Sequence, residues 1–348
     1  MSLTHSLFSS SKSRLMDKAF IKNKLNQSYD CSPLEDRCYA WLIILDIFSI
    51  DSEDWKRKGL TMKNTYESYI NDFGITNWHM TPLDHGSKLE FRRKSIMDLI
   101  HSDIIRSKEH LCFLPNQSIK SDEFNDSLLS CFGEHMRRQE RILYTFACLN
   151  PWIEYMQGFN EILQPLYYCV FSSSSLFHDD KELMECVVFN MFSKLLTMTD
   201  LPDFFAAQKD EDQIEKLLQA PMSALMKKYC PRVHSRFEQL SIRYSLFAYR
   251  WFCVLFSQEF PMPDLVSIWD SLFAHIEDIL LFAFLIGIGF LIELECRILE
   301  QDFAGIMNTL HSIPTNDIKK ILIFANNAWA LERPKNTPDL DISGLVCV

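Results

Sequence analysis

The stretch ILLFAFLIGIGFLI, residues 279–292, decides the fold class because it places 14 uncharged and mostly large apolar residues in succession. A helix that spans a bilayer needs about 20 such residues, so this run is too short. Acidic side chains flank it closely: Glu277 and Asp278 before it, Glu293 and Glu295 after it. We therefore expect a helix buried on all sides within a large helical domain, and no transmembrane segment.

The rest of the chain has the same helical character. It contains 9 glycines, none in an Asn-Gly or Asp-Gly pair, and runs of alternating polarity are scarce, so the usual hairpin signals are missing. Apolar residues instead recur at spacings of three and four between prolines. The helical stretches predicted in this way are 131–149, 159–171, 181–198, 232–260, 265–273, 278–299 and 317–330. This pattern predicts an all-α fold.

A polar loop, Ser172–Ser175, is expected to separate the helices into two lobes. Before it and after it the chain holds several long helical stretches, enough for each lobe to have its own apolar interior. The expected divisions are an N-terminal appendage (1–29), one domain (30–330) with an N-lobe of about 30–175 and a C-lobe of about 176–330, and a tail (331–348).

The appendage allows an amphipathic helix with Leu15, Ala19 and Phe20 on its apolar side. Such a helix can pack against the domain or lie on a membrane surface. We favour packing, because a formal net charge of −11 gives the chain little attraction to anionic lipid. The same charge disfavours nucleic acid, whose phosphates select clustered Lys and Arg. A protein partner or a small ligand is the better expectation.

The 11 cysteines are scattered, odd in number and free of CxxC pairs, so neither a disulfide framework nor a zinc-binding spacing is visible. We interpret them as reduced thiols that pack like small apolar residues, and we expect no bound metal. The first residues lack the apolar core of a secretory signal. The expected compartment is the cytoplasm.

The segment SIMDLIHSDIIR, residues 95–106, carries the first candidate functional residue. On a helical wheel Asp103 falls inside the apolar face, where an ionised carboxylate is costly unless it has a partner. Arg106, three residues later, lies at the edge of that face and is the natural partner. The residues that share the face are Ile96, Leu99, Ile100 and Ile104.

Two interpretations of this pair stay open. Asp103 and Arg106 can form a structural ion pair that closes the end of a helix. Alternatively, Asp103 holds Arg106 in a fixed direction so that the guanidinium can enter another protein's site. A planar, permanently charged fork suits stabilisation of the charge on a transferring phosphoryl group, and a fixed orientation lowers the entropy cost.

The segment NPWIEYMQGFNE, residues 150–161, carries the second candidate. Asn150-Pro151 ends one helix and a new helix is predicted to begin near Phe159, which places Gln157 on a turn with the flexible Gly158 behind it. A glutamine amide can both accept and donate hydrogen bonds, as positioning an attacking water beside phosphate oxygens requires. Taken alone, the Gln-Gly pair is weak evidence, because such a pair more often marks only a turn.

Together the two segments resemble a known family. Residues 100–106, IHSDIIR, fit the IxxDxxR motif of TBC-domain Rab GTPase-activating proteins, and residues 155–158, YMQG, fit their YxQG motif. In that family the arginine and the glutamine of these motifs are the catalytic fingers, so the resemblance implies those roles for Arg106 and Gln157. It makes supporting residues of Ile100, Asp103, Tyr155, Gly158 and Asn160.

Further blocks resemble the family over about residues 30–330. They contribute structural motif residues, some of which the resemblance would allow to contact the partner: Arg37, Trp41, Arg141, Arg250, Trp251, Trp269 and Asp270. The runs 150–168 and 256–274 resemble one subgroup of the family most closely. Two departures stand out: Cys31-Ser32-Pro33 replaces the usual Gly-Ile-Pro, and Phe159 replaces the usual Met. The first departure removes a flexible turn residue and so puts the shape of the entry loop in doubt. The second changes the packing beneath the glutamine but leaves its amide in place.

The resemblance implies a partner rather than a bound cofactor. The partner would be a Rab-family small GTPase in the GTP-bound state, which carries GTP and Mg²⁺ itself; this chain has no GxxxxGK[ST] phosphate loop. The chain would supply catalytic residues in trans, and membrane contact would be indirect, through a Rab on endomembranes. A Rab-binding adaptor without activity is the alternative. A hydrolase or metal enzyme is disfavoured because HExxH and GxSxG motifs are absent.

Overall fold

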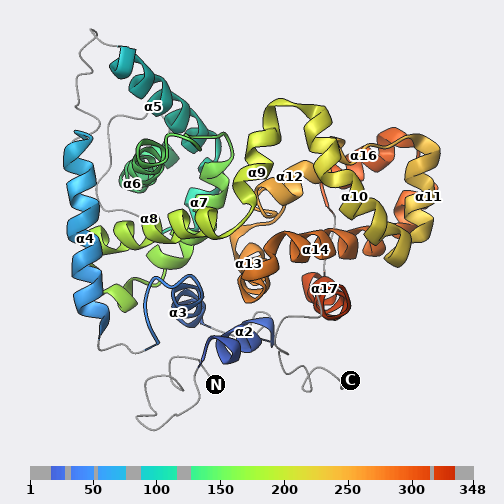
Figure 1. Ribbon diagram of the computed structural model, residues 1–348, viewed down its shortest axis with the longest axis horizontal. Helices are drawn as coiled ribbons and strands as arrows, with labels where there is room; N and C mark the ends of the chain where they lie inside the picture. The colour runs from blue at the N-terminus through green and yellow to red at the C-terminus, as the bar shows by residue number, and fades with distance from the viewer. Residues whose placement is uncertain are drawn as a thin grey trace.

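A computed structural model describes residues 17–27, 33–50, 54–75, 88–115, 127–313 and 317–333 of the chain. Within these ranges every regular element is a helix, which confirms the all-α prediction (Figure 1). Most of the predicted tail (331–348), most of the predicted appendage and the Cys31-Ser32 departure lie outside the described residues, and the first two tail residues, 331 and 332, belong to the helix Ile318–Glu332.

The helices form two groups. The first comprises α2 (Lys18–Gln27), α3 (Leu34–Ile44), α4 (Trp55–Asp72), α5 (Lys88–Arg106), α6 (Ser127–Leu149), α7 (Phe159–Phe171) and α8 (Lys181–Met198). The second comprises α9 (Leu201–Ala206), α10 (Glu211–Tyr229), α11 (Pro231–Leu240), α12 (Ala248–Cys253), α13 (Met262–Ala274), α14 (Ile279–Glu293), α15 (Glu295–Glu300), α16 (Phe303–His311) and α17 (Ile318–Glu332). Short 3₁₀ turns connect them: η3 (Lys108–Phe113), η4 (Ser174–Phe177), η5 (Ala207–Lys209), η6 (Tyr244–Leu246) and η7 (Ile276–Asp278).

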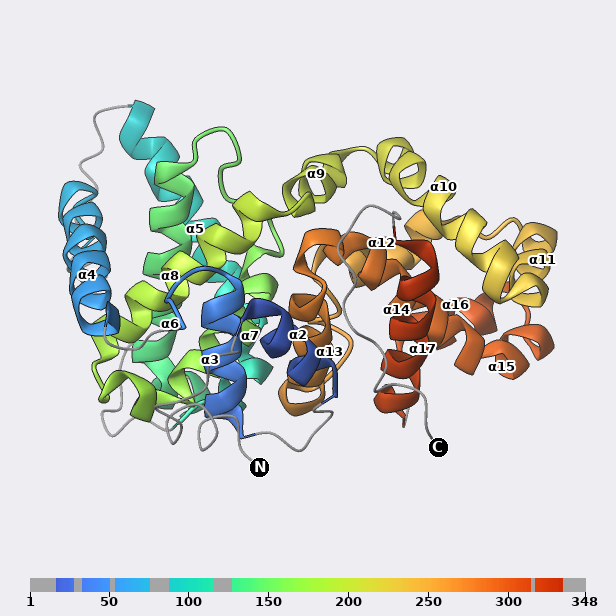
Figure 2. The ribbon, with the colours of Figure 1, turned by 60° about the horizontal axis from the view of Figure 1, so that its bottom comes forward.

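Helix α8 belongs by its contacts to the first group. It packs on α4, α6 and α7, whereas α14 packs on α10 and α17 in the second group. This differs from the sequence expectation, which divided the chain near residue 175, because the polar loop there only turns the chain from α7 into α8. Helix α13 joins the groups by packing on α2, α3 and α7 (Figure 2).

The apolar stretch 279–292 forms most of α14, and most of the residues of this helix are buried. Its Gly289 permits close approach to α17, since a Cβ there would lie 2.8 Å from Cγ2 of Ile321. Among the described residues no single helix is long and apolar enough to cross a membrane, although the pair 264–274 and 276–293, bent by 90°, meets the length and composition test as a unit.

The predicted helix 232–260 is wrong as a single element. The chain leaves α11 at Ser241, whose φ of 52° is left-handed and cannot continue a right-handed helix. It leaves α12 before Leu255 and Phe256, which also have positive φ values, 48° and 64°. No glycine marks these breaks. The predicted helix 278–299 is similarly divided into α14 and α15 at Leu294.

Helix α2 packs on the domain, but through a different face from the predicted one. Ile21 and Leu25 are buried against the helices around them, while Ala19 and Phe20, assigned to the apolar side, are exposed. Leu15 lies outside the described residues. For residues 18–27 the packing interpretation therefore describes the structure, with the contacts of α2 made to α3 and α13.

A buried polar cluster fastens α3 to α13. Asp270 accepts a hydrogen bond from the indole Nε1 of Trp41 at 2.7 Å and forms an ion pair with Nη1 of Arg37 at 2.9 Å. The side chains of Arg37 and Asp270 are only 6% and 3% exposed. In such surroundings each charge depends on its partner, because neither is solvated by water.

Two buried histidines predict how stability changes with pH. Burial lowers the pKa of His275, which stacks on Phe282 at 3.8 Å between ring centroids, to about 4, and it lowers the pKa of His135 to about 4 as well. Between about pH 4 and pH 6.5 these histidines are protonated in the unfolded chain, where their pKa is near 6.5, but stay neutral in the folded chain. The free energy of unfolding is therefore expected to be constant above pH 6.5 with respect to these groups and to fall as the pH is lowered towards 4.

The expected slope is about 1.4 kcal/mol per pH unit for each histidine. Urea unfolding measured at a series of pH values gives the total slope, to which carboxylates such as Glu161 and Glu259 also contribute, so the test is the difference between wild type and a histidine variant. His275→Gln is expected to remove one of the two contributions to it. A slope that stays the same in this variant would show that His275 is not the responsible group.

Candidate functional site

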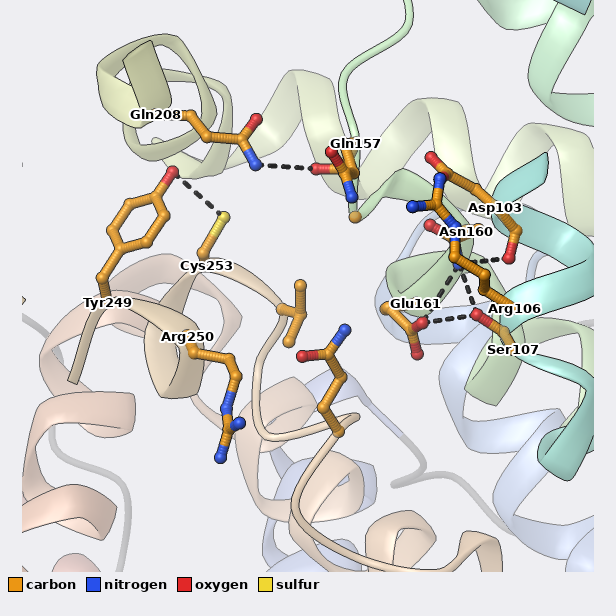
Figure 3. Close-up of a pocket in the computed structure, with 13 residues that line it drawn as sticks. Asp103, Arg106, Ser107, Gln157, Asn160, Glu161, Gln208, Tyr249, Arg250 and Cys253 are labelled. Atoms are coloured by element: carbon orange, nitrogen blue, oxygen red, sulfur yellow. Dashed lines mark hydrogen bonds and ion pairs between the residues drawn. The ribbon is translucent and has the colours of Figure 1, made fainter. Parts of the chain in front are cut away.

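A cavity of about 350 Å³ lies where the two groups of helices meet, and it holds both candidate fingers (Figure 3). The first group contributes the end of α5 and the start of α7, and the second contributes η5, α12 and the loop after α12. The lining residues are Asp103, Arg106, Ser107, Gln157, Gly158, Asn160, Glu161, Gln208, Tyr249, Arg250, Cys253, Val254 and Gln258.

Arg106 is the last residue of α5, and its guanidinium is held on one side while the side chain stays largely exposed. Its Nη2 donates to Oδ1 of Asp103, and its Nε donates to the carbonyl oxygen of Ser102 at 3.2 Å. Asp103 is 3% exposed, whereas the Arg106 side chain is 60% exposed. The guanidinium is thus oriented by a buried carboxylate while remaining accessible to a partner.

Tyr155 completes this arrangement from the loop before α7. Its hydroxyl donates to Oδ2 of Asp103 at 2.7 Å, so the carboxylate is held from both sides. Burial, reinforced by the negative charge of Asp103, raises the pKa of Tyr155 well above its ordinary value. Tyr155 therefore stays protonated and acts as a donor at neutral pH, and it ties the arginine helix to the loop that carries Gln157.

The apolar face of α5 agrees in part with the helical wheel. Ile100 and Ile104 are fully buried and Ile96 is half-buried, as expected. Leu99 is 39% exposed, so its assignment to the buried face was wrong. The buried face of α5 is therefore narrower than the wheel predicted, and it includes Asp103, as expected.

Gln157 is exposed on a turn, and Gly158 behind it is the N-cap of α7, as the sequence predicted. Gly158 has a φ of 102°, a conformation that glycine adopts without strain. A Cβ there would lie 3.1 Å from the ring of Phe205 and 3.3 Å from Val254. The main-chain carbonyl of Gln157 also accepts a hydrogen bond from Nε2 of Gln208 at 3.3 Å, so the second group of helices supports this turn.

A buried carboxylate forms the floor of the cavity. Oε1 of Glu161 accepts from Oγ of Ser107 at 2.5 Å and from Nδ2 of Asn160 at 3.1 Å, and Oε2 lies 3.2 Å from Nε2 of His110. Burial alone would raise the pKa of Glu161, but the hydrogen bonds and the charge of His110 lower it below its usual range. Asn160 also donates to the carbonyl oxygen of Asp103 at 3.5 Å. The network joins the end of α5 to the first turn of α7.

The opposite wall presents a second arginine. Nε and Nη2 of Arg250 donate to the two carboxylate oxygens of Glu259 at 2.7 and 3.0 Å, and Nη2 also donates to the carbonyl oxygen of His311. Because these bonds occupy two nitrogens of its guanidinium, Arg250 holds the wall of the cavity together and does not point into its centre. Burial raises the pKa of the neighbouring Cys253 thiol to about 12, which leaves it protonated and unreactive at neutral pH.

The structure brings together some, but fewer than half, of the residues singled out in the sequence. Six of them line the cavity: Asp103, Arg106, Gln157, Gly158, Asn160 and Arg250. Ile100 and Tyr155 are buried behind it. The remaining motif residues, Arg37, Trp41, Arg141, Trp251, Trp269 and Asp270, are outside the lining and serve packing or ion pairs within the fold.

Several lining residues had not been identified. Ser107 follows Arg106 directly, and its position at the end of the predicted helix was a usable signal. Gln208, Tyr249 and Gln258 gave no signal, because they reach the cavity only through the packing of the second group of helices on the first. Phe159, the departure from the usual Met, is fully buried and makes edge contacts with Phe205 and neighbouring rings.

The chain resembles known proteins in sequence and in fold. It is 36% identical over 190 residues to TBC1 domain family member 13 of Mus musculus, covering 54% of this chain and 46% of that protein. A TBC domain-containing protein of Schizosaccharomyces pombe is 34% identical over 224 residues, covering 60% and 35%. The chain therefore spans between a third and a half of the length of these relatives. The match to member 13 identifies the subgroup that residues 150–168 and 256–274 resemble.

Solved structures support the same fold. The crystal structure of the Ypt/Rab-GAP domain of Gyp1p superposes with a TM-score of 0.71 at 19% identity, covering 94% of this chain and 97% of that domain. The Chlamydomonas flagellar RabGAP TBC domain gives 0.55 at 15% identity, covering 89% and 84%. The family model of the Rab-GTPase-TBC domain matches residues 84–296, which include both candidate fingers. The chain belongs to the Rab-GTPase-TBC domain family.

Proposed function

We propose that this protein is a GTPase-activating protein that accelerates GTP hydrolysis by a Rab-family small GTPase in its GTP-bound state. The observation that carries the proposal is the placement of Arg106 and Gln157, from two separate elements, on one open cavity. Arg106 is accessible and is directed by the buried Asp103. Nucleotide and Mg²⁺ belong to the partner, and the chain contributes side chains alone.

In the proposed reaction a water attacks the γ-phosphorus of the bound GTP, the bond to the β–γ bridging oxygen breaks, and GDP and phosphate form. Arg106 stabilises the negative charge that develops on the oxygens between the leaving and transferring phosphates. Gln157 orients the attacking water through its amide. An arginine supplied in trans contributes about 10³ to 10⁵ in rate, or roughly 4 to 7 kcal/mol of barrier.

The proposed site of action is the cytoplasmic face of endomembranes, which the protein reaches through its Rab and not through a membrane segment of its own. The decisive experiment is a panel of purified GTP-loaded Rabs assayed for single-turnover hydrolysis with and without this protein. We expect strong acceleration for one Rab or a few. A protein that binds Rabs across the panel but never accelerates hydrolysis would instead be an adaptor.

The Asp103→Ala variant tests whether Arg106 is directed by its partner. Without the carboxylate, the arginine must be ordered anew at each encounter, at a cost of about 0.5 to 1.5 kcal/mol, and the hydroxyl of Tyr155 loses its acceptor. We expect kcat/KM for the responsive Rab to fall by about 2- to 10-fold from this cost, and further where the guanidinium is misplaced, while the protein remains folded.

Melting curves recorded beside the kinetics separate this role from a purely structural one. Tyr155→Phe is the matched control, because it removes one hydrogen bond to Asp103 and keeps the ion pair with Arg106. It is expected to lose less activity than Asp103→Ala. Full activity of Asp103→Ala at an unchanged melting temperature would contradict the directing role. A large drop in melting temperature would favour the structural ion pair.

A further inference from the structure

Trp152 is 96% exposed, although it carries one of the largest apolar side chains in the protein. Among the described residues the next most exposed large apolar side chains are Leu331 and Leu60, at 72% and 61%. Single exposed leucines are common on protein surfaces. An indole left almost wholly in water is different, since tryptophan is the residue type most enriched among those that dominate binding energies at interfaces.

The backbone around Trp152 is fixed. Asn150 closes a tight turn, in which its carbonyl oxygen accepts from the N–H of Ile153 at 3.0 Å and from the N–H of Glu154 at 2.8 Å. Glu154 has a left-handed φ of 59°, and its carboxylate pairs with Arg92 on α5. Ile153 packs against the core. The indole is thus displayed by an ordered turn, which lowers the entropy cost of using it for binding.

The position of Trp152 relative to Gln157 limits what can cover it. Gln157 is five positions after Trp152, so their Cα atoms are at most about 18 Å apart, and the turn at Asn150 shortens that distance. A standard protein interface buries about 800 Å² on each partner, which corresponds to a roughly circular patch about 16 Å in radius. A protein of that footprint centred on Gln157 therefore covers a radius similar to the greatest possible distance of Trp152.

We propose that Trp152 is a docking anchor whose indole inserts into an apolar hollow on the partner GTPase, beside the nucleotide that Arg106 and Gln157 serve. The inference rests on the proposed function, and it adds a residue that acts in partner binding rather than in the chemical step. Continuity with the cavity favours this partner, because the loop that displays Trp152 is the loop that carries Gln157.

Two other occupants fit the surroundings less well. A lipid surface is disfavoured by the adjacent Glu154 carboxylate and by the formal net charge of −11. A second copy of this chain seated on Trp152 would also cover the neighbouring cavity and exclude the GTPase. The partner GTPase is the occupant that uses the cavity and the indole together.

The test is single-turnover hydrolysis by the Rab that responds most strongly in the panel, measured over a range of activator concentrations. Trp152→Ala is expected to raise the half-saturating concentration about 10- to 100-fold and to leave the maximal rate unchanged, because the indole contributes equally to the ground state and the transition state. Trp152→Phe is expected to fall between wild type and alanine. Leu60→Ala, which also removes an exposed apolar side chain but on α4, is the matched control and is expected to behave as wild type.

The outcomes separate this inference from the function beneath it. If wild type accelerates hydrolysis and Trp152→Ala has the same half-saturating concentration, the anchor is rejected and the proposed function stands. A lower maximal rate at unchanged half-saturation also rejects it, because it assigns Trp152 to the geometry of the glutamine loop. If no Rab in the panel responds to wild type, both fall together.

Two binding measurements address the alternative occupants. Co-sedimentation with vesicles of phosphatidylcholine and phosphatidylserine is expected to be equally low for wild type and Trp152→Ala. If wild type binds the vesicles and Trp152→Ala does not, the indole binds membranes and the proposal is overturned. Sedimentation velocity is expected to give the same oligomeric state for both. A change to a smaller species in Trp152→Ala would assign the residue to self-association and overturn the proposal.

Discussion

Arg106→Ala is expected to lower the maximal rate of activated GTP hydrolysis by about 10³-fold or more, because no other described side chain presents a directed, accessible guanidinium at the centre of the cavity. Arg250, the other arginine of the lining, is held by Glu259. Arg106→Lys is expected to recover little, since an ammonium has the charge but lacks the planar fork that contacts two oxygens at once.

Gln157→Ala is expected to have an effect of similar kind, because an unoriented water attacks less often. If both residues serve one transition state, the double variant loses much less than the sum of the two free energies. Affinity for the GTP-loaded Rab is expected to survive in all three variants, since the fingers contribute mainly where charge develops. Rates and affinities should be measured side by side for each protein.

Arg232→Ala is a suitable control, because Arg232 is 71% exposed on α11 and pairs only at the surface with Glu295. It is expected to retain wild-type activity. A wild-type rate in Arg106→Ala would exclude the arginine from the chemistry, and strictly additive losses in the double variant would mean that the two residues act on different steps.

Asp270→Ala is expected to lower the free energy of unfolding by about 3 to 5 kcal/mol, because it removes the carboxylate that faces the buried Arg37 and accepts from Trp41. The cost arises chiefly from a buried charge that loses its compensation. We expect the loss of stability to arise where α3 packs on α13, the helix that joins the two groups.

Urea unfolding at neutral pH gives this difference directly, with hydrolysis measured well below the melting temperature as a second readout. Asp54→Ala is the matched control, since Asp54 forms a surface ion pair with Arg57, and such pairs contribute about 0 to 1 kcal/mol. Similar losses in the two variants would show that burial does not determine the value of the Asp270 pair.

The sequence was most informative where periodicity was long and uninterrupted. Helices α7 and α8 have the bounds that were predicted, because three-and-four spacing reveals each helix, while Gly158 and the capping residue Asp180 mark where the two helices begin. It failed around α12, where Ser241, Leu255 and Phe256 adopt left-handed backbone conformations that their residue types rarely choose. Tertiary packing over-determines the backbone there, and no local signal reveals it.

The candidate site divides in the same way. The half contributed by α5 and α7 could be predicted, since Asp103 and Arg106 are one helical turn apart and Gln157 precedes a helix start. The other half could not. Gln208 is 51 positions beyond Gln157, and its hydrogen bond to that residue exists only because α9 and η5 fold back over the loop.

The packing of Gly158 between Phe205 and Val254 has a consequence for how activity can diverge within the family. Both proposed fingers belong to the first group of helices, yet the glutamine turn rests on residues of the second, while Arg106 takes its direction from α5 and Tyr155. Substitutions at Phe205 or Val254 are thus expected to alter the proposed activity first through the glutamine turn. They can also reach the arginine, because Tyr155 on the same loop holds Asp103 and contacts Phe159, which packs on Phe205.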